Sequence, residues 1–269
     1  RDIAGMWRSF AYAFAVAGLW KKDHKGWVRP AMPWALFCAG ILGLGIMMGA
    51  AWAYESLTFG GYWAWDPVEN ASMVPWLLLV AGIHTLLIFQ STGHSLQASY
   101  VFIVLSYLLV LYSTFLTRTG VLGDTSVHSF TGEGSTLYWH LIIMMLVFLV
   151  APIIFYFQDR KNIPVEAKEE NLDSREFWMF VGSLLLFIAG LYIIILTSLP
   201  FFNKLFGTKW AIGEDVEFVY NRIMILVAII LGKLTGITQY FKYKNTTSKY
   251  LWSKLWLSLI HISEPTRPE

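Results

Sequence analysis

The sequence has 269 residues, of which 56% are hydrophobic and only 14% are charged, and its net charge is +2. About a quarter of the residues of a typical soluble domain are charged, so this composition excludes an ordinary soluble protein and indicates one embedded in a membrane. The single cysteine, Cys38, excludes an internal disulfide, a CxxC redox pair and a cysteine-based zinc site.

Long apolar stretches follow one another along the chain. The stretches 34–54, 99–117, 137–157 and 177–199 contain no Asp, Glu, Lys or Arg. Each is long enough to cross a hydrocarbon layer of about 30 Å at about 1.5 Å per residue. In chain order, the expected spans are 9–20, 31–54, 73–90, 99–117, 137–157, 177–199 and 219–241, with an eighth beginning near 250. We therefore predict an all-α fold, a polytopic transmembrane helix bundle of about seven to eight spans.

The domain organisation follows from these spans. No soluble domain fits between them, so residues 1–258 are expected to form one integral membrane domain. The first stretch, 9–20, is too short to span unaided and the chain does not start with Met, which together suggest a piece of a longer protein. Residues 259–269 stop the last helix abruptly and fit no membrane element, so we expect a non-native tail there.

The basic residues predict the orientation in the membrane. Loops on one side hold eleven of them: Lys21, Lys22, Lys25, Arg29, Arg160, Lys161, Lys168, Arg175, Lys242, Lys244 and Lys249. Loops on the other side hold only Arg118, Lys204 and Lys209. Because loops rich in Lys and Arg remain in the cytoplasm, segment 61–70 and the loops 118–136 and 200–217 are expected to share the outer face.

The most distinctive segment combines six aromatic residues with two carboxylates. The aromatic residues are Trp52, Tyr54, Phe59, Tyr62, Trp63 and Trp65. Such residues are favoured at the membrane–water interface and also form platforms for planar ligands, so anchoring and ligand binding both remain open. Asp66-Pro67 before an apolar run predicts a helix start, with Asp66 as N-cap and Glu69 as its capping-box partner. Orientation of a ligand is compatible with that role.

Two histidines are candidate metal ligands. His84 lies about eleven residues into its expected helix, roughly 16 Å deep. There it is either a neutral imidazole bonded to a carbonyl or hydroxyl, or an axial ligand of a buried haem. His128 lies in the outer loop near the apolar Val127 and Phe130, and is either a solvated loop residue or an iron ligand beside the aromatic segment. Arg118, at the membrane edge, either snorkels or neutralises a haem propionate.

Two other features have plainer interpretations. His24, His94 and His140 lack supporting context and are expected to be ordinary surface or helix-end histidines. Gly45 and Gly49 form a GxxxG spacing, which is expected to mark a close contact between helices.

Three segments resemble the haem-handling proteins of cytochrome c maturation that carry a WWD motif, in particular their CcmF type. The first segment contains Trp63-Ala-Trp-Asp-Pro-Val-Glu-Asn-Ala-Ser-Met-Val-Pro-Trp76. The second, Gly82-Ile-His-Thr-Leu86, is similar to the helix that bears a buried histidine, and the third, 115–130, to the segment that bears an external histidine. The three follow the expected order within residues 28–132, whereas after about residue 160 only general membrane character remains.

The resemblance implies a function and a set of haem-binding residues. The implied protein is the haem-handling subunit of the cytochrome c haem lyase, which joins haem through thioether bonds to the CxxCH motif of apocytochrome c. By this resemblance His128 is an axial ligand of a transient haem at the WWD segment, and His84 of a separate, permanently held b-type haem. The residues assigned to haem are Trp63, Trp65, Asp66, Glu69, Arg118, His84 and His128.

The same resemblance implies a location and partners. The location is the bacterial inner membrane, with the WWD segment facing the periplasm. The partners are a CcmE-like haem chaperone, a CcmH-like subunit that presents thiols, apocytochrome c and membrane lipid. The second ligand of each haem lies outside this chain in the family, so the chain alone is expected to be inactive.

Two other functions remain open from the sequence. One is a haem exporter or carrier that hands haem over without forming a bond, although carriers in this superfamily differ in the residues after Asp66. The other is a secondary transporter whose aromatic residues only anchor it, which predicts no haem absorbance after purification.

Overall fold

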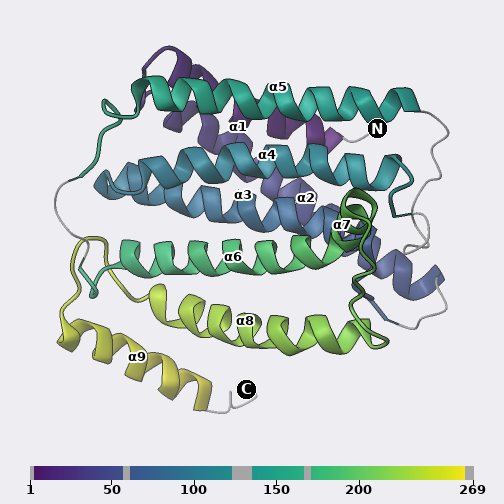
Figure 1. The fold of residues 1–269 in the computed structure, drawn as a ribbon. Coiled ribbons are helices and arrows are strands. Elements are labelled where there is room, and N and C mark those ends of the chain that lie inside the picture. Colours follow the sequence, from purple (N-terminus) through teal and green to yellow (C-terminus); the bar gives the residue numbers. More distant parts are fainter. Residues whose placement is uncertain (1–2, 57–60, 123–134, 167–170, 264–269) are drawn as a thin grey trace.

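The computed structural model describes residues 3–56, 61–122, 135–166 and 171–263 as a helical bundle (Figure 1). The helices are α1 Ile3–Trp20, α2 Val28–Ser56, α3 Pro67–Thr92, α4 Leu96–Arg118, α5 Ser135–Asp159, α6 Arg175–Thr197, α7 Leu199–Phe206, α8 Val216–Thr238 and α9 Ser248–Ser263. No strand occurs within those ranges. The predicted all-α fold is confirmed.

The lengths of the helices match most of the predicted spans. Six helices are long and apolar enough to cross a membrane: α2, α3, α4, α5 from Leu137, α6 and α8. The apolar part of α1, Phe10–Trp20, is shorter, as expected. The short helix α7 was not predicted, and it begins at Leu199-Pro200, where proline suits the first turn of a helix. Helix α9 extends into the segment that the sequence suggested was a tail.

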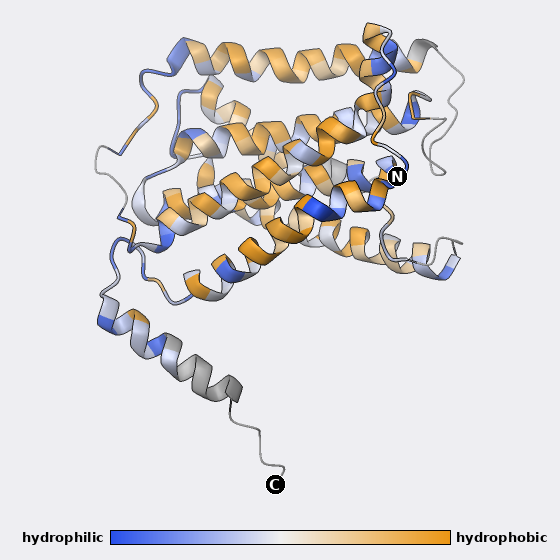
Figure 2. Cartoon of the chain, turned by 60° about the horizontal axis from the view of Figure 1, so that its bottom comes forward, coloured by the Kyte–Doolittle hydropathy of each residue, from blue (hydrophilic) through white to orange (hydrophobic). Residues whose placement is uncertain are grey.

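Helix α3 occupies the centre of the bundle. In its most apolar window 61% of the residues are buried, compared with 11% for each of α2, α5 and α8. It packs against α2, α4 and α6, while α1 and α5 lie beyond α4, and α8 lies beyond α6. The peripheral helices α2, α5 and α8 expose many large apolar side chains. Hydrophobic residues dominate the helices of the bundle, and hydrophilic residues concentrate in the connections (Figure 2). This distribution suits helices surrounded by hydrocarbon.

The helices alternate in direction, so their connections gather at two ends of the bundle. We call the end with residues 61–66, 119–122 and 198–215 the tryptophan end, and the end with 21–27, 160–166 and 239–247 the basic end. Tyr112 donates to the Ser198 hydroxyl at the first (2.8 Å), and the Arg175 amide donates to the Lys242 carbonyl at the second (3.0 Å). The predicted grouping of the loops is therefore confirmed for the described residues.

Candidate functional site

Hydrogen bonds to two carboxylates shape the entry into α3. Asp66 is the N-cap of α3, and its side chain accepts from the Val68 amide at 2.8 Å. Glu69 accepts from the amides of Asp66 at 3.2 Å and Ala64 at 3.0 Å. The predicted capping box is confirmed, and both carboxylates fix the backbone that carries the tryptophans.

Trp65 points into the protein rather than out of it. Only 8% of its surface is exposed, and its backbone is in the left-handed region with φ of 57°, which is uncommon for a bulky residue. Its ring stacks on Tyr220 of α8 at 4.8 Å, and its indole N–H donates to Asn221 at 2.8 Å. Asn70 donates to the Trp65 carbonyl at 3.0 Å. Trp65 therefore joins the segment to α8 and supports the site from behind.

Trp63 is one of two tryptophans, with Trp27 at the basic end, whose buried indole N–H has no acceptor among the described residues. The ring of Trp63 packs edge-on against Trp65, with the centroids 6.0 Å apart. Its indole N–H is buried, and no described residue accepts a hydrogen bond from it. A buried donor without an acceptor is costly, but Trp27 has the same unpaired group, so the donor does not by itself indicate a ligand.

An apolar cavity of about 480 Å³ opens beside these two tryptophans. We call it the tryptophan cavity. It is lined by Gly43, Ile46, Met47, Trp63, Trp65, Met73, Trp76 and Asn221, from α2, α3, α8 and segment 61–66. Its volume is within the range of cofactor sites, and its lining is mostly aromatic and aliphatic with few polar groups, as in such sites.

The GxxxG spacing of α2 lies next to this cavity and does not make a helix contact. A Cβ atom added at Gly45 or Gly49 would meet no described atom within 4 Å. Both glycines line a neighbouring hollow of about 270 Å³ on the other side of Trp63. For the described residues, the expected close helix contact is therefore wrong.

His84 lines a second cavity, of about 300 Å³, which we call the His84 cavity. Its Nδ1 lies 2.9 Å from the Val80 carbonyl oxygen. A carbonyl only accepts, so Nδ1 carries the proton and Nε2 keeps its lone pair. His84 lies about 12 Å from the end of α3 at Thr92, nearer to the basic end than to the tryptophan end.

Of the other two predicted site residues, the structure describes only Arg118, which is at the tryptophan end. Arg118 is the last residue of α4, exposed, where a basic side chain interacts favourably with the helix dipole. His128 lies outside the described residues. The structure thus brings together Trp63, Trp65 and the two capping carboxylates, and it holds His84 at a separate site.

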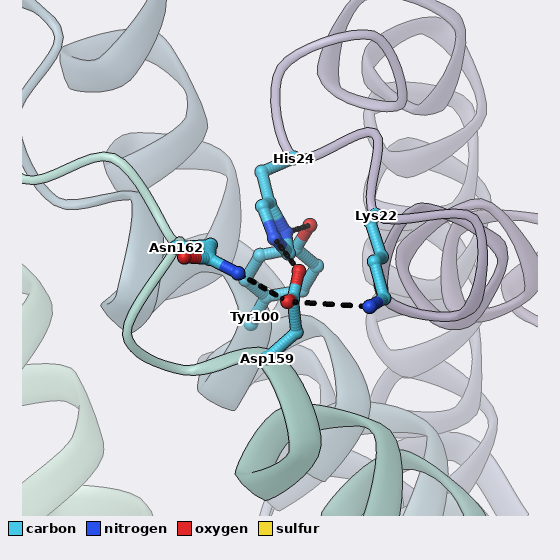
Figure 3. A network of polar contacts seen from close by, with 5 residues as sticks. All are labelled: Lys22, His24, Tyr100, Asp159 and Asn162. Carbon is cyan, nitrogen blue, oxygen red and sulfur yellow. Dashed lines mark hydrogen bonds and ion pairs between the residues drawn. The ribbon is translucent and has the colours of Figure 1, made fainter.

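A buried polar cluster at the basic end corrects the expectation for His24 (Figure 3). His24 is only 6% exposed, and its Nε2 lies 2.8 Å from the Asp159 carboxylate. Its Nδ1 lies 3.2 Å from the Tyr100 hydroxyl, while Asn162 donates to Asp159 at 2.6 Å. The cluster joins the α1–α2 loop to α4 and α5. His24 is therefore not a surface histidine, and the sequence concealed this because its partners are 76 and 135 residues away.

Sequence reasoning also missed the residues of α8 that support the tryptophan segment. Tyr220 and Asn221 follow Glu217 in an apolar helix that resembles nothing specific. The only feature of the sequence that pointed to them is that two side chains able to form hydrogen bonds, Tyr220 and Asn221, are adjacent near the start of this helix. Its meaning depends on Trp65, which is 156 residues away from Asn221.

Comparison with known proteins supports the predicted relationship. The pattern of the family described as cytochrome C assembly protein matches residues 8–122. The cytochrome c-type biogenesis protein CcmF of Pseudomonas fluorescens is 33% identical over 90% of this chain and 36% of its own length. The CcmF protein of Escherichia coli is 35% identical over 83% of this chain and 34% of its own length.

A solved structure agrees with the sequence matches. The structure named cytochrome c heme lyase CcmF superimposes with a TM-score of 0.70 and 26% identity, covering 95% of this chain and 37% of that one. The chain thus spans a little over a third of the relatives that it matches. By its sequence and its fold, the chain is similar to part of the CcmF type, and its residues 8–122 match the cytochrome C assembly protein family.

Proposed function

We propose that this chain is the haem-handling part of a cytochrome c haem lyase, which holds haem at the tryptophan end for thioether attachment to apocytochrome c. The observation that carries the proposal is the apolar tryptophan cavity, which Trp63, Trp65 and Trp76 line. A CcmF-type relationship makes haem the expected planar ligand.

The residues of the tryptophan cavity suit a transiently held haem substrate. Trp63 and Trp76 offer aromatic surface to a macrocycle. The capping box fixes the segment before any ligand arrives, so little order is lost on binding. We assign the iron ligand of this site to His128 and an interaction with a propionate to Arg118.

The His84 cavity suits a resident haem. The lone pair of Nε2 is available for iron, because the Val80 carbonyl oxygen fixes the proton on Nδ1. Haem bound there would supply a one-electron redox centre. The apolar part of the lining, which includes Leu87, Leu186 and Leu231, would exclude water from that centre.

The chemistry that we assign to the chain is positioning. Each substrate thiol adds across a vinyl group, so a sulfur–carbon bond forms and the thiol proton ends on the neighbouring carbon. Cys38 is buried in α2 and is no nucleophile for this reaction, since the substrate provides both thiols. A site that holds the porphyrin still while the thiols approach raises their effective concentration by orders of magnitude.

The location and partners follow from the same proposal. The basic end would face the cytoplasm and the tryptophan end the periplasm, because basic loops stay inside. A CcmE-like chaperone would deliver haem there, and a CcmH-like subunit would present the thiols of apocytochrome c. The membrane would be the bacterial inner membrane.

Replacement of Trp63 by alanine tests the proposal. We would place this chain in the matched third of the Escherichia coli relative and require the unsubstituted hybrid to mature a c-type cytochrome. Trp63→Ala should then lose most haem capture at normal protein level, because the aromatic surface disappears. Trp20→Ala is a matched control, since Trp20 is 67% exposed at the basic end. Normal maturation by Trp63→Ala would refute the proposed site.

The second candidate function, a haem exporter or carrier, is favoured by the same cavity. The two differ in product. A lyase component yields cytochrome whose haem resists acid–acetone extraction, whereas a carrier yields only haem-loaded chaperone. Extraction of the cytochrome made by the hybrid therefore separates them.

A further inference from the structure

The His84 cavity has a cation at one end and the histidine at the other. Arg175, the first residue of α6, lines the cavity together with Thr238, Gln239 and Tyr243. The remaining lining, around His84, is mostly apolar and contains Leu87, Leu186 and Leu231. The cavity is therefore amphipathic along its length.

The register of the helices gives the separation of these two groups. Helices α3 and α6 run antiparallel, because Asn70 donates to Thr197 at 3.2 Å and a Cβ atom on Gly190 would touch Leu78. The same register places Arg175 opposite Gly93, roughly 14 Å beyond His84 along the helix axis. A ligand that reaches both groups has to be long, apolar toward His84 and acidic at the end toward Arg175.

The guanidinium of Arg175 is held in place by the end of α8. It donates to the carbonyl oxygens of Thr238 at 3.4 Å and Gln239 at 2.8 Å, and it lies 5.5 Å from the centre of the Tyr243 ring. Through these contacts Arg175 caps the C-terminal end of α8. They engage two of five N–H groups, however, which leaves donors for a ligand.

No acidic residue is among the described residues that line this cavity. The neighbouring Glu176 is turned to the Lys244 amide, which donates to its two carboxylate oxygens at 2.8 and 2.9 Å. Arg175 is thus a fixed cation at an otherwise uncharged cavity, an arrangement suited to a bidentate carboxylate.

From this geometry we propose that Arg175 is a positioning residue that binds the carboxylates of the porphyrin whose iron His84 ligates, so that the acid edge of the resident haem faces the basic end. The inference rests on the proposed haem at His84. It adds the orientation of that haem and the residue that sets it.

The test compares two ligands and three forms of the protein. The chain would be purified from bacterial membranes in detergent and titrated with haem and with its dimethyl ester, following the Soret band. The unsubstituted chain should bind the free acid about tenfold more tightly, as expected for a charge-assisted hydrogen bond. Arg175→Met should reduce this ratio to near one, and Arg175→Lys should retain part of it.

Controls separate the possible failures. Arg222→Met removes an exposed charge of α8 outside this cavity and should keep the full ratio. In a His128→Ala background, which removes the proposed ligand of the other haem, His84→Ala should abolish the spectrum of ligated haem, whereas His140→Ala, which removes an exposed histidine of α5, should not. If His84→Ala binds haem normally, the proposed haem site is wrong. If His84→Ala loses haem and Arg175→Met keeps the tenfold ratio, only the orientation is wrong.

An anionic lipid headgroup is the other source of a negative group for Arg175. Native mass spectrometry of the same variants would detect it. Loss of bound phosphatidylglycerol from Arg175→Met, with an unchanged ratio between haem and its ester, would assign the guanidinium to lipid and overturn the inference.

Discussion

Single residues of segment 61–66 act through hydrogen bonds more than through their apolar character. Asp66 and Glu69 cap α3, and the carbonyl and indole N–H of Trp65 are bonded to Asn70 and Asn221. An aromatic cluster that was only anchored at an interface would not need these specific partners. The arrangement supports a preorganised binding segment.

The cap gives a prediction for Asp66. Asp66→Ala should lower the free energy of unfolding by about 1 kcal/mol, because the Val68 amide loses its acceptor. Asp66→Asn should retain most of that stability, since an amide oxygen also caps. Denaturant unfolding in detergent measures both. Equal losses in the two variants would contradict a capping role and indicate one for the negative charge.

Asn221 gives a second prediction at this scale. Asn221→Leu should destabilise the protein by about 1–3 kcal/mol, because the buried indole N–H of Trp65 loses its acceptor. In a Trp65→Phe background the same change should cost much less, since no donor remains. The free energy of unfolding of the unsubstituted protein, the two single variants and the double variant gives the interaction energy of the pair in a double-mutant cycle. A cost that is independent of the residue at 65 would show that Asn221 acts elsewhere.

At the scale of elements, α3 connects the two cavities. Met73 and Trp76 line the tryptophan cavity, and His84 lines the other about 12 Å further along the same helix. Close packing against α4 and α6 holds this helix. The spacing of the two sites therefore depends on the small residues that permit such packing.

Substitution of Gly82 tests the close packing of α3 against α4. The Cβ position of Gly82 lies 2.9 Å from Ile103 Cδ1 of α4, so Gly82→Val should destabilise the bundle by about 1–3 kcal/mol. Gly45→Val is the matched control, because that position on α2 faces open space. In thermal unfolding in detergent, Gly82→Val should have a lower melting temperature than Gly45→Val. Ile103→Ala should relieve part of the defect, and failure to do so would mean that the strain lies elsewhere.

For the whole molecule, we expect variants of the two proposed haem sites to fail separately. Two axial ligands of one iron lie within about 4–5 Å of each other. His84 lies about 26 Å along α3 from the tryptophan end, where the loop with His128 begins. These two histidines should therefore belong to different irons.

Variants of the two histidines in the hybrid protein test this arrangement. His84→Ala should lose the haem that copurifies, measured as pyridine haemochrome, because the iron loses its axial bond. His128→Ala should keep that haem and lose only the haem delivered by the chaperone. Added imidazole should rescue the second variant more readily than the first. Loss of the same spectral species in both variants would reduce the two sites to one.

Much of this protein could be predicted from its sequence, because the relevant signals are local. Uncharged stretches of some twenty residues specify membrane helices wherever they occur, and Asp66-Pro-Val-Glu69 specifies a capped helix start within four residues. The alternation of direction then assigns every loop to one of two ends. The resemblance to the family rests on motifs equally short.

Only the tertiary structure decided which way the side chains point and what they meet. Trp65 is buried because Tyr220 and Asn221, about 155 residues later, lie behind it. His24 is buried because Asp159 and Tyr100 reach it from other helices. Uniformly apolar helices carry little periodicity, so the sequence leaves their packing faces undefined, and the cavities arise from contacts between distant segments.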